Sequence, residues 1–269
     1  MRAVFAALAL IVVVAGSPRA EGLEEVIRLH EAGDYLAAAE RGRELDTAEA
    51  LARAANALAI HGYFIAPPGE RAGFFRQAHG LAERAREQAE AAGVADKRLL
   101  GYIAFQEGQA LGRLAEVLPM DERLDYADPV HEAFEAALAL DAERWEAHVG
   151  LARWHAQSML VADDEAGGIG AFFANVFVGA SYEEAEVHRA AAVAIEKSQP
   201  ERKAAWFESA EIRLLIDPEE NRTAAKAELE RSLAIAPSNA LTRTLDGLAG
   251  ACLEDISACN ARIRARLLE

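Results

Sequence analysis

The seven histidines have the widest chemical range of any residues in this chain, because imidazole binds metals and transfers protons near neutral pH. A zinc-binding helix carries two histidines one turn apart, with a glutamate directly after the first. His131 and Glu135 stand one turn apart without a second histidine, and His148 and His155 are about two turns apart, beyond the reach of one ion. The pattern therefore predicts structural histidines, no metal site and no cofactor.

Residues 163–170 (DDEAGGIG) are the other place where ion or phosphate chemistry could be expected. A phosphate loop needs a Lys-Ser/Thr pair after its glycines, and this segment has instead three acidic residues before them, which would repel phosphate. A calcium loop needs alternating ligand positions, which are missing. Serine and threonine form no nucleophile motif, so we predict no catalytic residues and a protein that is not an enzyme.

Cys252 and Cys259 are the only cysteines. In one unbroken helix they would lie about 10 Å apart along the axis, whereas a disulfide needs Cα atoms within about 7 Å. A bond between them therefore requires a turn near Asp255, which would cap a final helix. Two buried free thiols are the alternative.

The charge balance bears on possible partners. The chain has 28 basic and 44 acidic residues and a formal net charge of −16. Nucleic acid and anionic lipid surfaces both require clustered lysine and arginine, so neither is expected as a partner.

Residues 1–20 have the composition of a secretory signal peptide: Arg2, then an apolar run from Val4 to Gly16, then small residues before Ala20. The run is shorter than the roughly 20 residues that span a bilayer as a helix, so we expect cleavage after Ala20 and no stable membrane span. No cysteine lies near the cut, so the mature chain, residues 21–269, is expected to be periplasmic and not lipidated.

The mature chain is predicted to be all-α. Apolar residues recur at helical spacing, no stretch alternates with the period of a strand, and the prolines fall at joints. The first unit is a hairpin over residues 23–45 that turns at 33–35. Further helices are expected over 47–64, 71–92, 96–117, from Pro129 to 140, 145–161, 182–196, 201–216, 223–236, 239–251 and 254–268.

Two joints between these helices have the pattern of a tetratricopeptide repeat: residues 137–148 (ALALDAERWEAH) and 232–239 (SLAIAPSN). Helical hairpins that cannot bury their apolar faces alone stack on one another. The predicted fold is therefore a tetratricopeptide-like α-solenoid of about six irregular hairpins.

Three features together resemble two groups of tetratricopeptide-like proteins. They are the joint at 137–148, the apolar insertion between Val161 and Ser181, and the sequence at 179–185 (GASYEEA) where the helical pattern begins again. One group is the periplasmic T-component of TRAP transporters, and the other is the regulator of microtubule dynamics family. The first resemblance implies contact with a periplasmic substrate-binding protein and an apolar pore or cleft; the second implies a scaffold, in some members with lipid handling. The chain lacks the lipidated cysteine of the T-component pattern.

With Trp145 as the first position of its repeat, the inner face of the solenoid is predicted to present Glu146, Val149, Arg153 and Gln157, with Leu151, Ala152 and His155 packed between helices. Arg153 either pairs with a carboxylate or is a solvated side chain balanced by neighbouring acids. In the insertion, Phe172, Phe173 and Phe177 either line a cleft over this face or belong to an additional core helix.

Solenoid surfaces usually bind rather than react, so a non-enzymatic periplasmic scaffold or adaptor that binds a protein partner is expected. The alternative is an accessory of a transport system that binds a lipophilic small ligand. An open polar groove would favour the scaffold, and an apolar tunnel would favour the ligand carrier.

Overall fold

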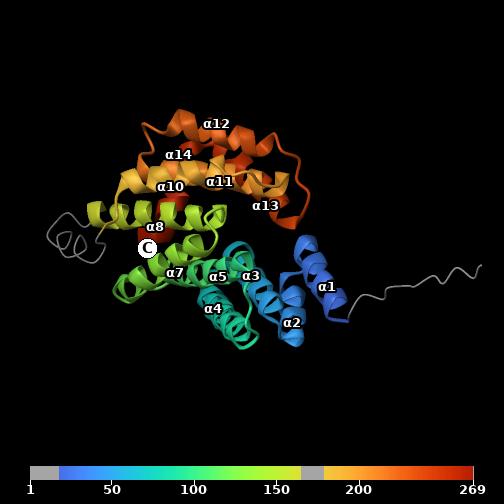
Figure 1. The fold of residues 1–269 in the computed structure, drawn as a ribbon. Coiled ribbons are helices and arrows are strands. Elements are labelled where there is room, and N and C mark those ends of the chain that lie inside the picture. Colours follow the sequence, from blue (N-terminus) through green and yellow to red (C-terminus); the bar gives the residue numbers. More distant parts are fainter. Residues whose placement is uncertain (1–17, 165–178, 269) are drawn as a thin grey trace, which may run out of the picture.

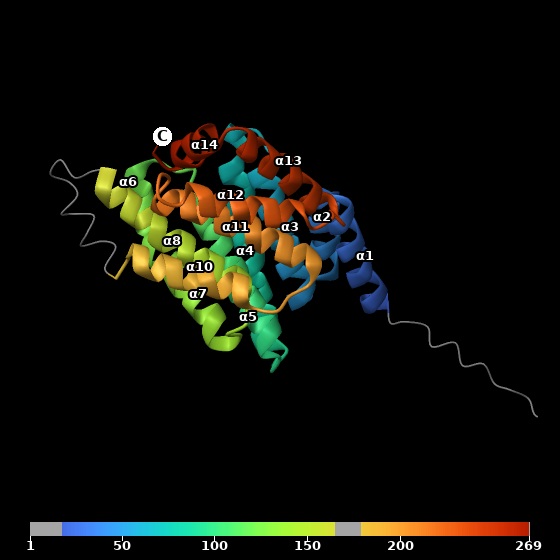
Figure 2. The ribbon, with the colours of Figure 1, turned by 90° about the horizontal axis from the view of Figure 1, so that it is seen from above.

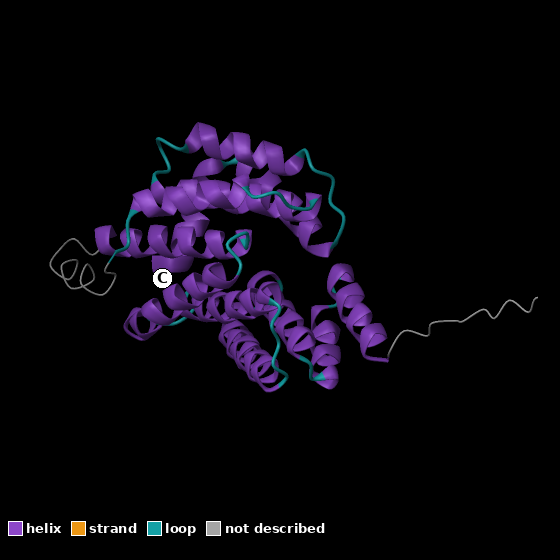
Figure 3. Cartoon of the chain, in the orientation of Figure 1, coloured by secondary structure: helices purple, strands orange, loops and turns teal. Residues whose placement is uncertain are grey.

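The structure is a computed structural model that describes residues 18–164 and 179–268. Within these two stretches every regular element is a helix and no strand occurs (Figure 3). The elements are α1 (Pro18–Ala32), α2 (Tyr35–Leu45), α3 (Ala48–Phe64), α4 (Pro68–Ala91), α5 (Lys97–Ala115), α6 (Met120–Arg123), the short 3-10 helix η1 (Leu124–Tyr126), α7 (Ala127–Leu140), α8 (Trp145–Asp164), α10 (Tyr182–Ala194), α11 (Gln199–Ile216), α12 (Arg222–Leu233), α13 (Ala240–Glu254) and α14 (Ile256–Leu268).

The all-α prediction is confirmed, and the helices begin where short polar side chains cap them. Thr47, Asp96, Ser181 and Asn239 each accept a hydrogen bond from a backbone N–H of the following first turn. The sequence prediction left out α6 and η1, which fill residues 120–126 before α7 begins. Pro129 therefore lies inside the first turn of α7 rather than opening the helix, a position where its missing amide does no harm.

The helices form two groups that lie on either side of α8 (Figure 1). Helices α1 to α7 make up one group and α10 to α14 the other; seen from above, α11 and α12 lie over α3 and α4 (Figure 2). Most helices pack against their neighbours in the chain, and α3 also packs against α5, α8 against α11, and α11 against α13. This order is that of helical hairpins laid side by side.

The two groups also meet at the far side from α8, where α1 contacts α13. Gly33, at the end of α1, has φ +95°, and a Cβ there would lie 2.7 Å from Cβ of Ala240. Leu241 packs against apolar clusters of both groups. Only glycine permits this backbone angle together with this approach, so the turn that was expected at residue 33 also closes the molecule.

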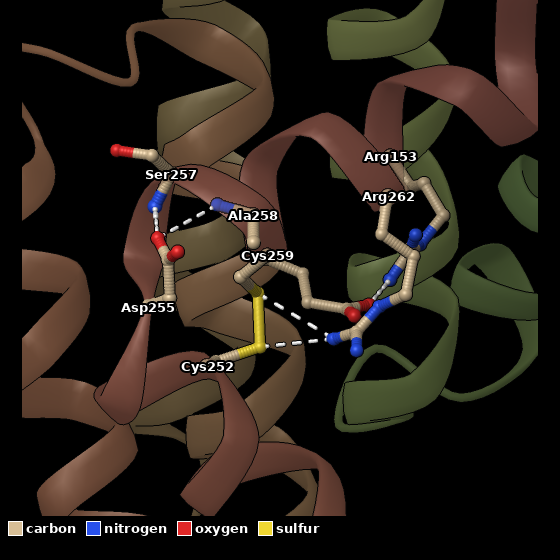
Figure 4. Close-up of a disulfide and its surroundings, with 8 residues drawn as sticks. Arg153, Cys252, Asp255, Ser257, Ala258, Cys259 and Arg262 are labelled. Carbon is tan, nitrogen blue, oxygen red and sulfur yellow. Dashed lines mark hydrogen bonds and ion pairs between the residues drawn. A yellow bond between two sulfur atoms is a disulfide. The ribbon is translucent and has the colours of Figure 1, made fainter.

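The last two helices are joined covalently (Figure 4). Cys252 and Cys259 form a disulfide, with their Cα atoms 4.9 Å apart. The helix breaks at Asp255, whose Oδ1 accepts hydrogen bonds from the backbone N–H groups of Ser257 and Ala258. This break lets the chain turn between the two helices and brings the two sulfurs together.

Two parts of the sequence prediction lie outside the described residues. They are residues 1–17, which hold most of the expected signal peptide, and residues 165–178, which hold Phe172, Phe173 and Phe177. The expected cleavage point after Ala20 falls in the first turn of α1. Among the described helices, none is both long enough and apolar enough to cross a membrane.

Candidate functional site: a cavity between the two helix groups

A cavity of about 370 Å³ lies between the two helix groups. Its wall comes mainly from α3, α5, α7, α8, α11 and α13, so segments far apart in the sequence build it together. A cavity of this size is in the range of small-molecule sites, which are mostly apolar with a few placed polar groups. The apolar part of the wall includes Ile60, Phe64, Phe105, Phe134, Val149 and Leu245.

The four residues predicted for the inner face, Glu146, Val149, Arg153 and Gln157, all line this cavity. The three predicted to pack between helices are buried: Leu151 and Ala152 have no exposed surface, and His155 is 5% exposed. The repeat pattern therefore placed the faces of α8 in agreement with the structure. Whether any of the four contacts a ligand or a partner stays a prediction.

Arg153 lies in a buried network of charged side chains. Its Nη2 donates to Oε2 of Glu211 at 2.8 Å and also to Glu208, both on α11. Only 8% of Arg153 is exposed, so the expectation of a solvated arginine is wrong. Sequence reasoning could not name the two glutamates, because they are more than 50 residues away along the chain.

A second pair continues this network toward α5. Arg113 forms an ion pair of 3.0 Å with Glu116, and Nε2 of Gln157 donates to Oε1 of the same carboxylate at 2.9 Å. Burial alone would raise the pKa of Glu116, but Arg113 and Arg153 hold that pKa below its usual value. The guanidinium of Arg113 also lies 3.7 Å from the ring centre of Tyr63. The arginines and glutamates of this network therefore balance one another's charge inside the protein, and solvent does not.

Other polar groups in the cavity wall have no hydrogen-bond partner within the described residues. Gln106 is 1% exposed, and neither atom of its amide is bonded. The same holds for Oε1 of Gln109, Nε1 of Trp145 and Nε of Arg153. A buried polar group without a partner costs about 1 to 3 kcal/mol. Such groups in a cavity wall are suited to bind a molecule that enters.

A separate group of histidines lies between α7, α8 and α10. Nδ1 of His148 and Nδ1 of His188 are 2.9 Å apart, His188 stacks on His155 with ring centres 5.8 Å apart, and His131 approaches His155 edge-on. Burial and the charges of neighbouring histidines lower the pKa of His155 to about 4. The described residues contain no set of three or more side chains arranged to hold a metal ion.

The spacing of His148 and His155 placed both on one face of α8, but His188 is missing from that pattern. It comes from α10, beyond the insertion, and only the folded packing brings it between them.

No protein-family model matches the chain, and no curated protein and no solved structure is significantly similar to it. The resemblance to the T-component and to the regulator of microtubule dynamics family therefore stays an expectation from its motifs.

Proposed function

We propose that this protein is a non-enzymatic binding protein that holds one small, largely apolar molecule in the cavity between its two helix groups. The observation that carries the proposal is the cavity itself: about 370 Å³, lined by aromatic and aliphatic side chains, with buried polar groups that lack partners. An apolar wall gives affinity through burial, and a few polar groups fix the ligand's orientation.

We therefore favour a ligand-binding protein over a protein scaffold. A scaffold would present its inner face to a partner, and Glu146, Val149, Arg153 and Gln157 instead line a partly open, mostly apolar cavity between the two helix groups. Among the described residues, the large apolar side chains that are exposed are Leu36, Ile65 and Val187, which belong to different parts of the fold and do not suggest one docking surface.

We further propose that the helices form a tetratricopeptide-like solenoid that closes on itself, and that the protein works in the periplasm as an accessory of transport. The hairpin order of the helices and the two repeat-like joints support the first proposal. The composition of residues 1–20 supports the periplasmic location, and the resemblance to the T-component of TRAP transporters supports the transport role.

The binding proposal is tested with N-phenyl-1-naphthylamine, an uncharged dye whose fluorescence rises in apolar sites. We expect saturable binding of one dye per chain. Ala204 lines the cavity from α11 and is partly exposed, so Ala204→Phe should fill space and weaken dye binding at least tenfold. Ala190→Phe, an equally large change at an exposed position of α10, should leave binding unchanged. Dye binding that is absent, or equally affected by both variants, would refute the proposal.

A further inference from the structure

One end of the cavity differs from the rest in its charge. Glu146, at the second position of α8, lines the cavity there, and its side chain is 22% exposed. Two aromatic residues, Trp145 and Tyr102, line the cavity near this carboxylate. This end therefore combines a carboxylate with aromatic rings.

The carboxylate of Glu146 is weakly matched by the protein. Among the described residues no other side chain donates a hydrogen bond to it, and the nearest cation is Nη1 of Arg144 at 3.8 Å. The guanidinium of Arg144 is already engaged, because its Nη2 donates to Asp141 at 2.9 Å and to the backbone carbonyl of Arg98 at 3.0 Å. Glu146 thus differs from Glu116 and Glu211, which have close arginine partners.

Burial raises the pKa of Glu146, and Arg144 and the residue's own backbone N–H only partly offset this effect. Glu201, at the start of α11, also lines this end and adds a second negative charge. Its Oε2 accepts hydrogen bonds from the backbone N–H and the hydroxyl of Ser198, so it is held in place at the helix start. Together the two carboxylates make this end of the cavity a negative one.

The cavity-lining arginines already balance carboxylates of the protein or bond its backbone. The cavity-lining arginines Arg113 and Arg153 are bound to glutamates, and Arg123 donates to backbone carbonyls. Nε of Arg153 has no partner, but the charge of this guanidinium is already balanced by Glu208 and Glu211, so a ligand carboxylate there would lie near two carboxylates and would also be repelled by Glu146. A ligand ammonium would instead gain a carboxylate partner and contact with aromatic rings.

We propose that the ligand is a cationic amphiphile, with an apolar body in the cavity and an ammonium group at Glu146. This inference rests on the proposed binding function and adds the charge of the ligand to it. The unpaired amide of Gln106, 1% exposed in the wall of the same cavity, is an independent sign of a polar ligand group, because an amide accepts from an ammonium and donates to a hydroxyl or carbonyl.

The test compares two probes with the same ten-carbon chain and opposite charge. n-Decylamine, protonated at pH 7.5, and decanoate are each titrated against protein loaded with N-phenyl-1-naphthylamine, below the concentrations at which they form micelles. We expect decylamine to displace the dye at a concentration at least tenfold lower than decanoate does. This comparison needs only the unaltered protein.

Glu146→Gln then assigns the preference, since it keeps the shape of the side chain and removes the charge. We expect the variant to lose the tenfold preference for decylamine, measured as the ratio of the two displacing concentrations on the same variant. Glu143→Gln, at an exposed position three residues away, should keep it.

The outcomes separate the two proposals. Failure of the dye to bind would overturn the binding function, and this inference with it. Dye binding with equal displacement by both probes, or with decanoate the better one, would overturn only the cationic ligand. A preference that survives in Glu146→Gln would remove Glu146 as its origin.

Discussion

Single residues in this protein differ sharply in how well their surroundings match their charge. Arg153, Glu208 and Glu211 lie together in the interior and match one another, whereas Glu146 faces the cavity with its nearest cation 3.8 Å away. Breaking a buried pair leaves an uncompensated charge, so the matched residues are expected to hold α8 against α11. The unmatched carboxylate has no such role, and this contrast makes it the better candidate for a ligand contact.

His155 is one of two described histidines, with His30, whose pKa is lowered to about 4 by burial, so its titration should affect stability. It lies among His131, His148 and His188, with Glu135 and Glu184 near the same cluster, and its pKa is about 4 in the fold against a usual 6.5. Because the folded state binds this proton less readily than the unfolded state, stability falls as the pH drops below 6.5 and continues to fall until about 4.

Between pH 7.5 and pH 5.0 the titration of His155 alone should lower the free energy of unfolding by about 2 kcal/mol. Replacing His155 with Gln should remove that part of the acid sensitivity, as measured by urea unfolding at the two pH values. The same replacement at His79, a partly exposed residue of α4, serves as the control. If His155→Gln and wild type lose equal stability on acidification, the low pKa of His155 is refuted.

At the scale of helices, glycines decide how closely α5, α7 and α8 approach. Phe134 of α7 lies where a Cβ on Gly150 would be 2.5 Å from its ring and a Cβ on Gly108 would be 2.8 Å away. The ring is 5% exposed and belongs to the cavity wall. The two glycines therefore open the space that Phe134 fills between neighbouring helices.

Gly150→Ala should destabilise the protein by about 1 to 3 kcal/mol, because the new methyl group must push the Phe134 ring away. Gly80→Ala, within α4, meets no atom within 4 Å and should instead stabilise by about 0.5 to 1 kcal/mol through helix propensity. Both values come from urea unfolding. Equal effects of the two changes would mean that the contact with Phe134 does not constrain the packing.

The helices themselves could be predicted from the sequence, because local signals set them. Capping residues such as Thr47 and Ser181 and the apolar periodicity of α8 act over a few residues, so their effect is readable without the fold. The partners of Arg153 and the place of His188 depend on contacts across 40 to 58 residues, which one sequence does not encode visibly. The resemblance implied an apolar cleft, but most residues of the cavity wall could not be predicted for the same reason: helices far apart in the sequence build it together.

Residues 120–126 form short helices that the sequence prediction left out. Their acidic residues and short length gave no helical periodicity, since α6 has 4 residues and η1 has 3, and periodicity is recognised over a window of roughly 11 residues or more. These short helices nevertheless carry Met120, Arg123 and Tyr126 into the cavity wall.

At the scale of the whole molecule, the contact between α1 and α13 joins the two helix groups a second time, away from α8. Leu241 is central to it, since its side chain lines the cavity and packs against apolar clusters of both helix groups. A ligand in the cavity touches both groups at once. Its binding free energy should therefore stabilise the closing contact as well as the wall around the ligand.

Hydrogen–deuterium exchange with and without n-decylamine tests this coupling. We expect slower exchange in α8 and also in the end of α1 and the start of α13, whereas α4 and α12, which contribute no residue to the cavity wall, should be unchanged.

Leu241→Ala should weaken both dye binding and the protection of α1, because it removes the side chain that bridges the groups. Leu248→Ala, which trims a partly buried leucine of the same helix outside the wall, should preserve both. Protection confined to α8 would mean that the ends of the chain close independently of the ligand, and that the cavity is a property of α8 and its neighbours alone.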